Sequence, residues 1–90
     1  MIKFTYTVRD KNGIHARPAG ALMNCAKKYT SDVTVTLSRE GETGLRKADA
    51  KRLLSIMGLG ARLGDVLEFT VSGVDENEAA AEIERVLHSI

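Results

Sequence analysis

The sequence predicts an α+β domain in which a four-stranded antiparallel sheet carries three helices on one face, an open-faced β-sandwich. Three segments alternate apolar and polar residues, as strands with one buried face do, and a fourth segment has a weak strand pattern. Two other segments repeat apolar residues at helical spacing, and a short third helix is predicted from a candidate cap and the glycines after it, so that the order along the chain is β-α-β-β-α-β-α. One such sheet with helices on one face buries all of these stripes together. Because 90 residues with 43% hydrophobic content suffice for one modest core, we expect residues 1–90 to form a single domain.

The N-terminal half is expected to begin with a strand, because apolar residues occupy every second position from Ile2 to Val8. Asn12-Gly13 marks a turn after this strand, since both residue types tolerate positive φ. A helix should then run from about Ala16 to Lys28, with Pro18 in the first turn, where its missing N–H would have no partner anyway. Alternating valine, leucine and hydroxyl residues predict a second strand over residues 33–38.

The middle of the chain gives weaker signals. Residues 39–44 form a polar loop with two glycines, which we expect to be mobile. A short third strand around Thr43 to Lys47 is compatible with a weak pattern. Asp49 is a candidate cap for a short second helix from about Ala50 to Met57, and the glycines that follow would stop it.

The C-terminal part gives clearer signals. Alternation from Val66 to Val71 predicts the last strand, and Asp75 to Glu78 have the spacing of a capping box. This box would open the final helix. The apolar stripe expected on that helix consists of Ala79, Ile83, Val86, Leu87 and Ile90.

The segment most suited to chemistry is the one in which the first turn becomes a helix. His15 should lie there, at or beside the N-cap, where unpaired backbone N–H groups and the positive pole of the macrodipole face outward. Together with Arg17 it would form a small anion-binding corner around an imidazole that is nucleophilic near neutral pH. We interpret His88 as a surface residue without a task and Cys25 as a small helix residue rather than a reactive thiol.

Composition argues against several functional classes. The formal net charge is +1 with both signs interspersed, which disfavours a nucleic-acid binder with a broad basic face. The apolar runs are far too short for a membrane span. A single cysteine excludes an internal disulfide framework, and the N-terminus lacks a signal-peptide core. We therefore expect a cytoplasmic location, and neither a metal nor a cofactor.

Residues 13–19, which read Gly-Ile-His-Ala-Arg-Pro-Ala, resemble the phosphorylation-site motif of HPr, the histidine-containing phosphocarrier family of the phosphoenolpyruvate-dependent sugar phosphotransferase system. The similarity covers nearly the whole chain. Residues 26–29 and Asp32 resemble the end of the family's first helix, and Leu59-Gly60, Gly64 and residues 73–77 resemble its second half. A motif of this length in a strand–loop–helix setting is specific.

The resemblance implies a phosphoryl relay. His15 would accept a phosphoryl group at Nδ1 from phosphorylated enzyme I and pass it to enzyme IIA components. Ala16, Arg17 and Pro18 would bind the phosphate, and the chain would act as a monomeric carrier rather than as an enzyme. The implied docking face combines the first two helices. It consists of Ala16, Arg17, Gly20, Ala21, Asn24, Lys27, Leu53, Leu54 and Met57.

The sequence departs from the family's pattern in two places. Some family members carry a regulatory serine at the start of the second helix, where an ungapped alignment places Arg52. A gapped alignment would place Ser55 there instead. We prefer the ungapped version, because the second helix must keep its register against the sheet. Ser55 then lies almost a turn further along the helix, and efficient phosphorylation by a serine kinase is not expected. The same alignment makes the hairpin around residues 39–47 longer than usual.

Two other functions fit the sequence less well. A regulatory binding module would dock on a transcription factor or a metabolic enzyme without carrying phosphate, which the retained His15 disfavours. An RNA binder on an exposed sheet is disfavoured by the presence of only four aromatic residues, with no RNP-like cluster and no basic excess. The sequence does not identify the sugars or pathways that a relay would serve.

Overall fold

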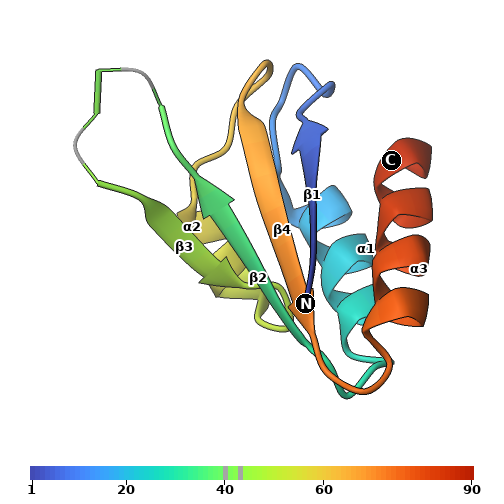
Figure 1. Cartoon of the computed structure of the whole chain (residues 1–90). Helices are drawn as coiled ribbons and strands as arrows, with labels where there is room; N and C mark the ends of the chain where they lie inside the picture. Colours follow the sequence, from blue (N-terminus) through green and yellow to red (C-terminus); the bar gives the residue numbers. More distant parts are fainter. Residues whose placement is uncertain (40, 43) are drawn as a thin grey trace.

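The computed structural model describes residues 1–39, 41–42 and 44–90, and it places three helices on one face of a four-stranded antiparallel sheet (Figure 1). The predicted fold class and order of elements are confirmed. The elements are β1 (Ile2–Thr7), α1 (Ala16–Ala26), β2 (Asp32–Leu37), β3 (Arg46–Asp49), α2 (Leu53–Gly58), β4 (Val66–Ser72) and α3 (Glu76–Ser89).

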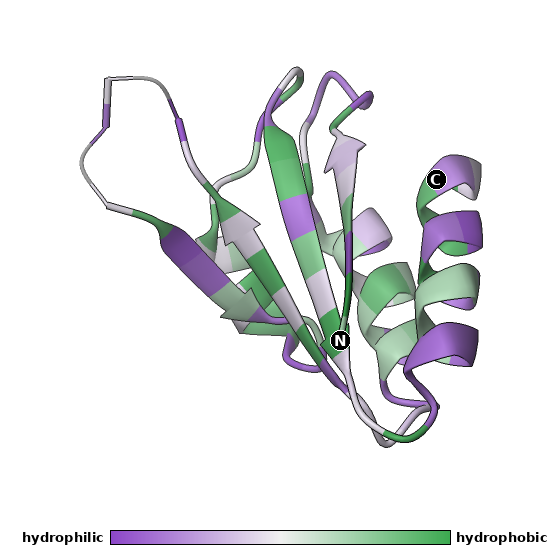
Figure 2. Ribbon diagram, viewed as in Figure 1, coloured by the Kyte–Doolittle hydropathy of each residue, from purple (hydrophilic) through white to green (hydrophobic). Residues whose placement is uncertain are grey.

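The sheet has the strand order β1-β4-β2-β3, so the two central strands come from opposite halves of the chain. Phe69 in β4 lies opposite Phe4 on one side and Val35 on the other. The rings of Phe4 and Phe69 stack with their centroids 5.1 Å apart, a cross-strand pair of the kind that stabilises antiparallel sheets. The alternation of apolar and polar residues that predicts the strands is visible along β4 and β2 (Figure 2).

The core lies between the sheet and the helices, because every second strand residue points toward them. The helices α1 and α3 each contribute a buried stripe, α2 contributes Ile56, and α1 contacts both α2 and α3. The largest fully buried side chains are Val8, Leu22, Val33, Val35, Leu37, Ile56, Leu59, Leu67, Phe69, Val71, Ile83 and Leu87. Of the stripe predicted on α3, Ile90 is wrong, because it follows the end of the helix and is exposed.

Several element boundaries differ from the prediction. α1 ends at Ala26 rather than Lys28, because the chain tightens into a turn in which Lys28 N–H donates to Cys25 O over 3.2 Å. β3 begins at Arg46, in the register that buries Ala48; Thr43, where we expected it to start, lies outside the described residues.

The start of α2 was predicted too early. Asp49 is the last residue of β3, and the N–H of Ala50 continues the extended segment by donating to Val33 O over 2.9 Å. The carboxylate of Asp49 instead accepts the N–H of Lys51 over 2.9 Å, which makes a turn rather than a helix cap. The helix therefore begins only at Leu53.

The capping box predicted before α3 is wrong, because among the described residues neither Asp75 nor Glu78 makes the cap hydrogen bond that it requires. Glu76 accepts the N–H of Gly73 over 3.1 Å, but Asp75, the N-cap residue, makes no cap bond. The Asp75 carboxylate points to the segment that precedes β2, where it accepts the N–H groups of Thr30 and Ser31 at 2.9 Å each and the Ser31 hydroxyl. These bonds lower the pKa of Asp75 to about 2, with the Ser31 hydroxyl as the largest cause.

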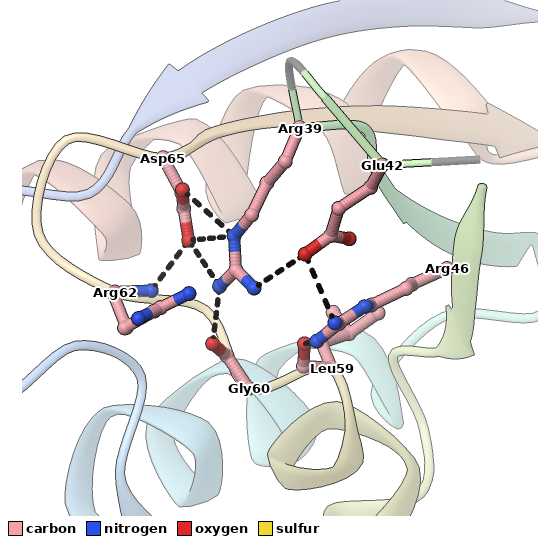
Figure 3. A network of polar contacts seen from close by, with 7 residues as sticks. All are labelled: Arg39, Glu42, Arg46, Leu59, Gly60, Arg62 and Asp65. Carbon is pink, nitrogen blue, oxygen red and sulfur yellow. Dashed lines mark hydrogen bonds and ion pairs between the residues drawn. The ribbon is translucent and has the colours of Figure 1, made fainter. Parts of the chain in front are cut away.

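The hairpin between β2 and β3 is fastened to the loop between α2 and β4 (Figure 3). Arg39 donates to the carboxylate of Asp65 at 2.7 Å and to the carbonyl oxygen of Gly60 at 2.6 Å. Arg46 donates to Leu59 O at 2.9 Å, and Glu42 lies between the two guanidinium groups. The described residues of this hairpin therefore hold the loop between α2 and β4 in place. The same loop contacts the segment before α1, because Ala61 O accepts the N–H of Ile14. The mobility expected for residues 39–44 stays a prediction.

Candidate functional site

A tight turn leads from β1 to the predicted histidine. The carbonyl oxygen of Asp10 accepts the N–H of Gly13 over 2.9 Å, and its carboxylate accepts the N–H of Asn12 over 2.8 Å. Gly13 has a φ of +70°, a conformation in which glycine is strongly preferred. A Cβ at this position would also overlap the carbonyl oxygen of Ala61, so the turn packs backbone against backbone. The predicted role of Asn12-Gly13 as a turn is confirmed.

His15 is the N-cap residue of α1, as predicted. Its backbone is extended (φ −92°, ψ −172°), and its carbonyl oxygen accepts the N–H of Ala19 over 3.0 Å. The side chain is 40% exposed, so it can be reached from solvent. Within the described part of the chain, the N–H groups of Ala16 and Arg17 have no hydrogen-bond partner, and Pro18 has no N–H at all. The start of α1 therefore presents two free donors beside the imidazole.

The ring of His15 lies in an open pocket of about 440 Å³. The predicted residues Arg17, Pro18 and Ala21 line this pocket with it. Asp10 and Asn12 close one side from the turn, and the end of the chain, Ser89 and Ile90, contributes another part of the wall. The pocket thus combines the β1–α1 turn, the first turns of α1 and the end of α3.

Asp10 is the functional candidate that the sequence analysis missed. Its Oδ2 lies 3.3 Å from Nε2 of His15, and both side chains are about two-fifths exposed. The hydrogen bond from Asn12 N–H lowers the pKa of the Asp10 carboxyl, and the contact with His15 lowers it further. The carboxylate is therefore ionised at neutral pH. An acidic residue in the turn before His15 was the only signal in the sequence.

Arg17 supplies positive charge in the same pocket as the imidazole of His15. Its side chain is exposed, and it forms no ion pair with any residue that the structure describes. An uncommitted guanidinium at a pocket edge is well suited to bind the oxygens of an anion such as a phosphoryl group.

The other predicted contact residues lie outside this pocket. On α1, Gly20 is half-buried and Asn24 is exposed, and Lys27, the C-cap residue of this helix, is exposed as well. On α2, Leu54 is 82% exposed and Met57 is 38% exposed, whereas Leu53 is half-buried and packs against the core. The helices α1 and α2 contact each other, so these residues lie on two neighbouring helices.

Ser55 is closer to the start of α2 than expected. Because the helix begins at Leu53, after Arg52 as the N-cap residue, Ser55 lies in its first turn rather than beyond it. The residue is half-buried, and its hydroxyl oxygen accepts the N–H of Asp49 over 3.1 Å. The hydroxyl is thus turned back toward β3.

The positions of Cys25 and His88 agree with the prediction of a small helix residue and a surface residue. Cys25 is a buried residue of α1, and burial raises the pKa of its thiol, with a further contribution from the nearby Glu82. His88 is an exposed residue of α3 whose ring meets the edge of Tyr6 at 6.1 Å between centroids. Neither residue lines the His15 pocket.

Comparison with known proteins agrees with this geometry. A family model described as "PTS HPr component phosphorylation site" matches residues 2–89. The chain belongs to the HPr family. Phosphocarrier protein HPr of Mycoplasma genitalium is 36% identical over 87 residues, which are 97% of this chain and 93% of that protein. A solved histidine-containing phosphocarrier protein from Mycoplasma superposes with a TM-score of 0.87 at 25% identity, covering 98% of this chain and 93% of the other.

A longer relative carries an HPr-like segment as a small part. The multiphosphoryl transfer protein of Haemophilus influenzae is 37% identical over 84 residues, or 92% of this chain, yet this chain spans only 16% of that protein's length. No helix within the described residues of this HPr chain is both long and apolar enough to cross a membrane.

Proposed function

We propose that this HPr chain accepts a phosphoryl group on Nδ1 of His15 from phosphorylated enzyme I and passes it to enzyme IIA components of the phosphotransferase system. The observation that carries the proposal is the position of His15. Its half-exposed imidazole lies at the N-cap of α1, in one pocket with Arg17 and beside the free N–H groups of Ala16 and Arg17. The names of the relatives, a phosphocarrier protein and a multiphosphoryl transfer protein, support the same chemistry.

The transfer needs a nucleophile and a place for negative charge. The lone pair of Nδ1 attacks phosphorus, the bond between phosphorus and the donor's leaving atom breaks, and a new N–P bond forms. The phosphoryl oxygens then face the N–H groups of Ala16 and Arg17, where the helix end contributes about 0.3–1 kcal/mol. The guanidinium of Arg17 adds a charge-assisted contact. These modest terms steady the phosphohistidine and still allow the group to leave.

The proposed docking surface consists of the pocket and the exposed residues of α1 and α2. Leu54 and Met57 offer apolar contacts beside the charged site, a combination that suits a small, transient interface used by several partners. Enzyme I and the IIA components would each have to bring their own active site to the same imidazole. The monomeric state and the cytoplasmic location remain predictions.

The relay is tested by charging and discharging the protein. The full chain is incubated with phosphoenolpyruvate and enzyme I, and its intact mass is measured before and after a IIA protein is added. We expect the mass to rise by one phosphoryl group and to fall again when IIA is present, and we expect acid to remove the group. A chain that gains no phosphate would overturn the proposal and favour a binding module that carries none.

A further inference from the structure

Asp10 is held in place by its own turn. Its Oδ1 accepts the N–H of Asn12 over 2.8 Å, and its carbonyl oxygen accepts the N–H of Gly13 over 2.9 Å. These two bonds leave Oδ2 free to face Nε2 of His15 at 3.3 Å. The carboxylate is therefore aimed at the imidazole by a backbone that the Gly13–Ala61 packing also fixes.

This contact discriminates between the two neutral forms of the ring. An ionised carboxylate can only accept hydrogen bonds, so Nε2 must carry the proton in order to bond with it. A neutral imidazole has one N–H and one lone pair, and the lone pair then lies on Nδ1. Among the described residues, Nδ1 has no hydrogen-bond partner that would compete for this lone pair.

We propose that Asp10 is a positioning residue that holds His15 in the Nε2–H tautomer and so presents the Nδ1 lone pair to the incoming phosphoryl group. This inference rests on the proposed function, because it takes Nδ1 as the atom that forms the N–P bond. In both donation and acceptance the proton stays on Nε2. Phosphorylation therefore places a positive charge on the ring, and that charge faces the Asp10 carboxylate.

One conservative substitution should invert the contact. In Asp10→Asn, the amide oxygen is expected to keep the bond from Asn12 N–H, since the reverse orientation would set two donors against each other. The amide NH₂ then faces Nε2 of His15, which must become an acceptor. The proton moves to Nδ1 and the nucleophilic lone pair is lost from that atom, although the turn is preserved.

The tautomer can be read directly in the unphosphorylated protein. Ring ¹⁵N chemical shifts are measured by NMR in the labelled full chain, at a pH well above the ordinary histidine pKa of about 6.5. His88 is an internal reference, because its exposed ring forms no hydrogen bond with any described residue. We expect His15 to favour Nε2–H more than His88 does, Asp10→Ala to bring it to the His88 ratio, and Asp10→Asn to shift it toward Nδ1–H. Identical tautomer ratios in His15, His88 and the two variants would overturn the inference.

Transfer kinetics supply the second measurement. For phosphorylation by enzyme I, Asp10→Asn should lower kcat by about tenfold with less effect on KM, because the tautomer matters after docking. The matched control is Glu78→Gln, which removes the same charge from an exposed residue in the first turn of α3. The pocket is lined by the other end of this helix, so kcat should be unchanged in the control. An unchanged kcat in Asp10→Asn would contradict the inference. Failure of the wild-type chain to be phosphorylated would instead overturn the proposed function, and the NMR comparison would still decide whether Asp10 sets the tautomer.

Discussion

The backbone N–H of Ile14 donates to the carbonyl oxygen of Ala61 over 3.1 Å and so holds the residue before His15 against the loop between α2 and β4. The same carbonyl oxygen fills the space beside Gly13. Arg39 and Arg46 brace this loop from the hairpin on its other side. The position of the imidazole therefore depends on segments that are distant in the sequence.

Gly13→Ala should damage both stability and transfer. Alanine is strained at a positive φ, and its Cβ would also overlap the carbonyl oxygen of Ala61. We therefore expect the free energy of unfolding, measured in urea, to fall by about 2–4 kcal/mol. The control is Gly64→Ala, where φ is +90° but a Cβ would meet nothing within 4 Å, and about 1–2 kcal/mol should be lost. Equal losses in the two variants would show that the contact with Ala61 is unimportant.

Arg17 is predicted to matter for transfer rather than for stability. Arg17→Glu places a negative charge beside the incoming phosphoryl group, and we expect both acceptance and donation to slow by at least about tenfold. Lys3→Glu makes the same change of charge on an exposed residue of β1 and should have little effect. Transfer rates of Arg17→Glu close to those of the wild type at low ionic strength would mean that the guanidinium is merely solvated.

Phosphorylation of Ser55 by an ATP-dependent HPr kinase is predicted to be inefficient. Ser55 is half-buried, and its hydroxyl oxygen accepts the N–H of Asp49, which holds the hydroxyl toward β3 and away from a kinase's catalytic base. Arg52→Ser is the informative variant, because it restores a hydroxyl at the N-cap of α2, where the ungapped alignment expects the family's serine. Mass spectrometry should find phosphate on the variant's new serine and little on Ser55. Stoichiometric phosphate on Ser55 of the wild type would show that the gapped alignment is right.

Acid should weaken the junction between α3 and the segment before β2. The pKa of Asp75 is lowered to about 2 in the folded protein from an ordinary 3.8, so its stabilising contribution is complete above about pH 4 and is lost as the pH falls toward 2. The free energy of unfolding of Asp75→Asn should be lower than that of the wild type at neutral pH. Between about pH 4 and 2 it should fall less steeply with pH than that of the wild type. Asp32→Asn, which removes an exposed carboxylate, is the control. An unchanged slope in Asp75→Asn would contradict the assignment.

The strands and the long helices were predictable because their patterns are local. The period of two assigns Val35 and Phe69 to the buried face without any knowledge of the partner strand. The start of α2 was not predictable, because Ala50 is kept extended by a hydrogen bond to Val33 from another strand. The failure of Asp75 to cap α3 was not predictable either, because its carboxylate binds Thr30 and Ser31 instead. In both cases a contact with a distant part of the chain outweighs the local pattern.

The site divides in the same way. His15 and Arg17 lie in one short motif whose turn, proline and helix start can be read in order, so the sequence predicts their place. Ser89 and Ile90 reach the pocket only because α3 packs beside α1, and no local pattern indicates this. The direction of the Asp10 carboxylate depends on turn geometry, which the residue types alone do not specify.

The most direct test of the central claim is to locate the phosphate. Wild-type protein, His15→Ala and His88→Ala are charged with phosphoenolpyruvate and enzyme I, and the acid-labile phosphate is mapped by peptide mass spectrometry under alkaline conditions. Because His15 is half-exposed at the N-cap, His15→Ala should keep the fold and carry no phosphate, whereas His88→Ala should be charged like the wild type. Acid-labile phosphate that persists on His15→Ala, on His88 or elsewhere, would contradict the account.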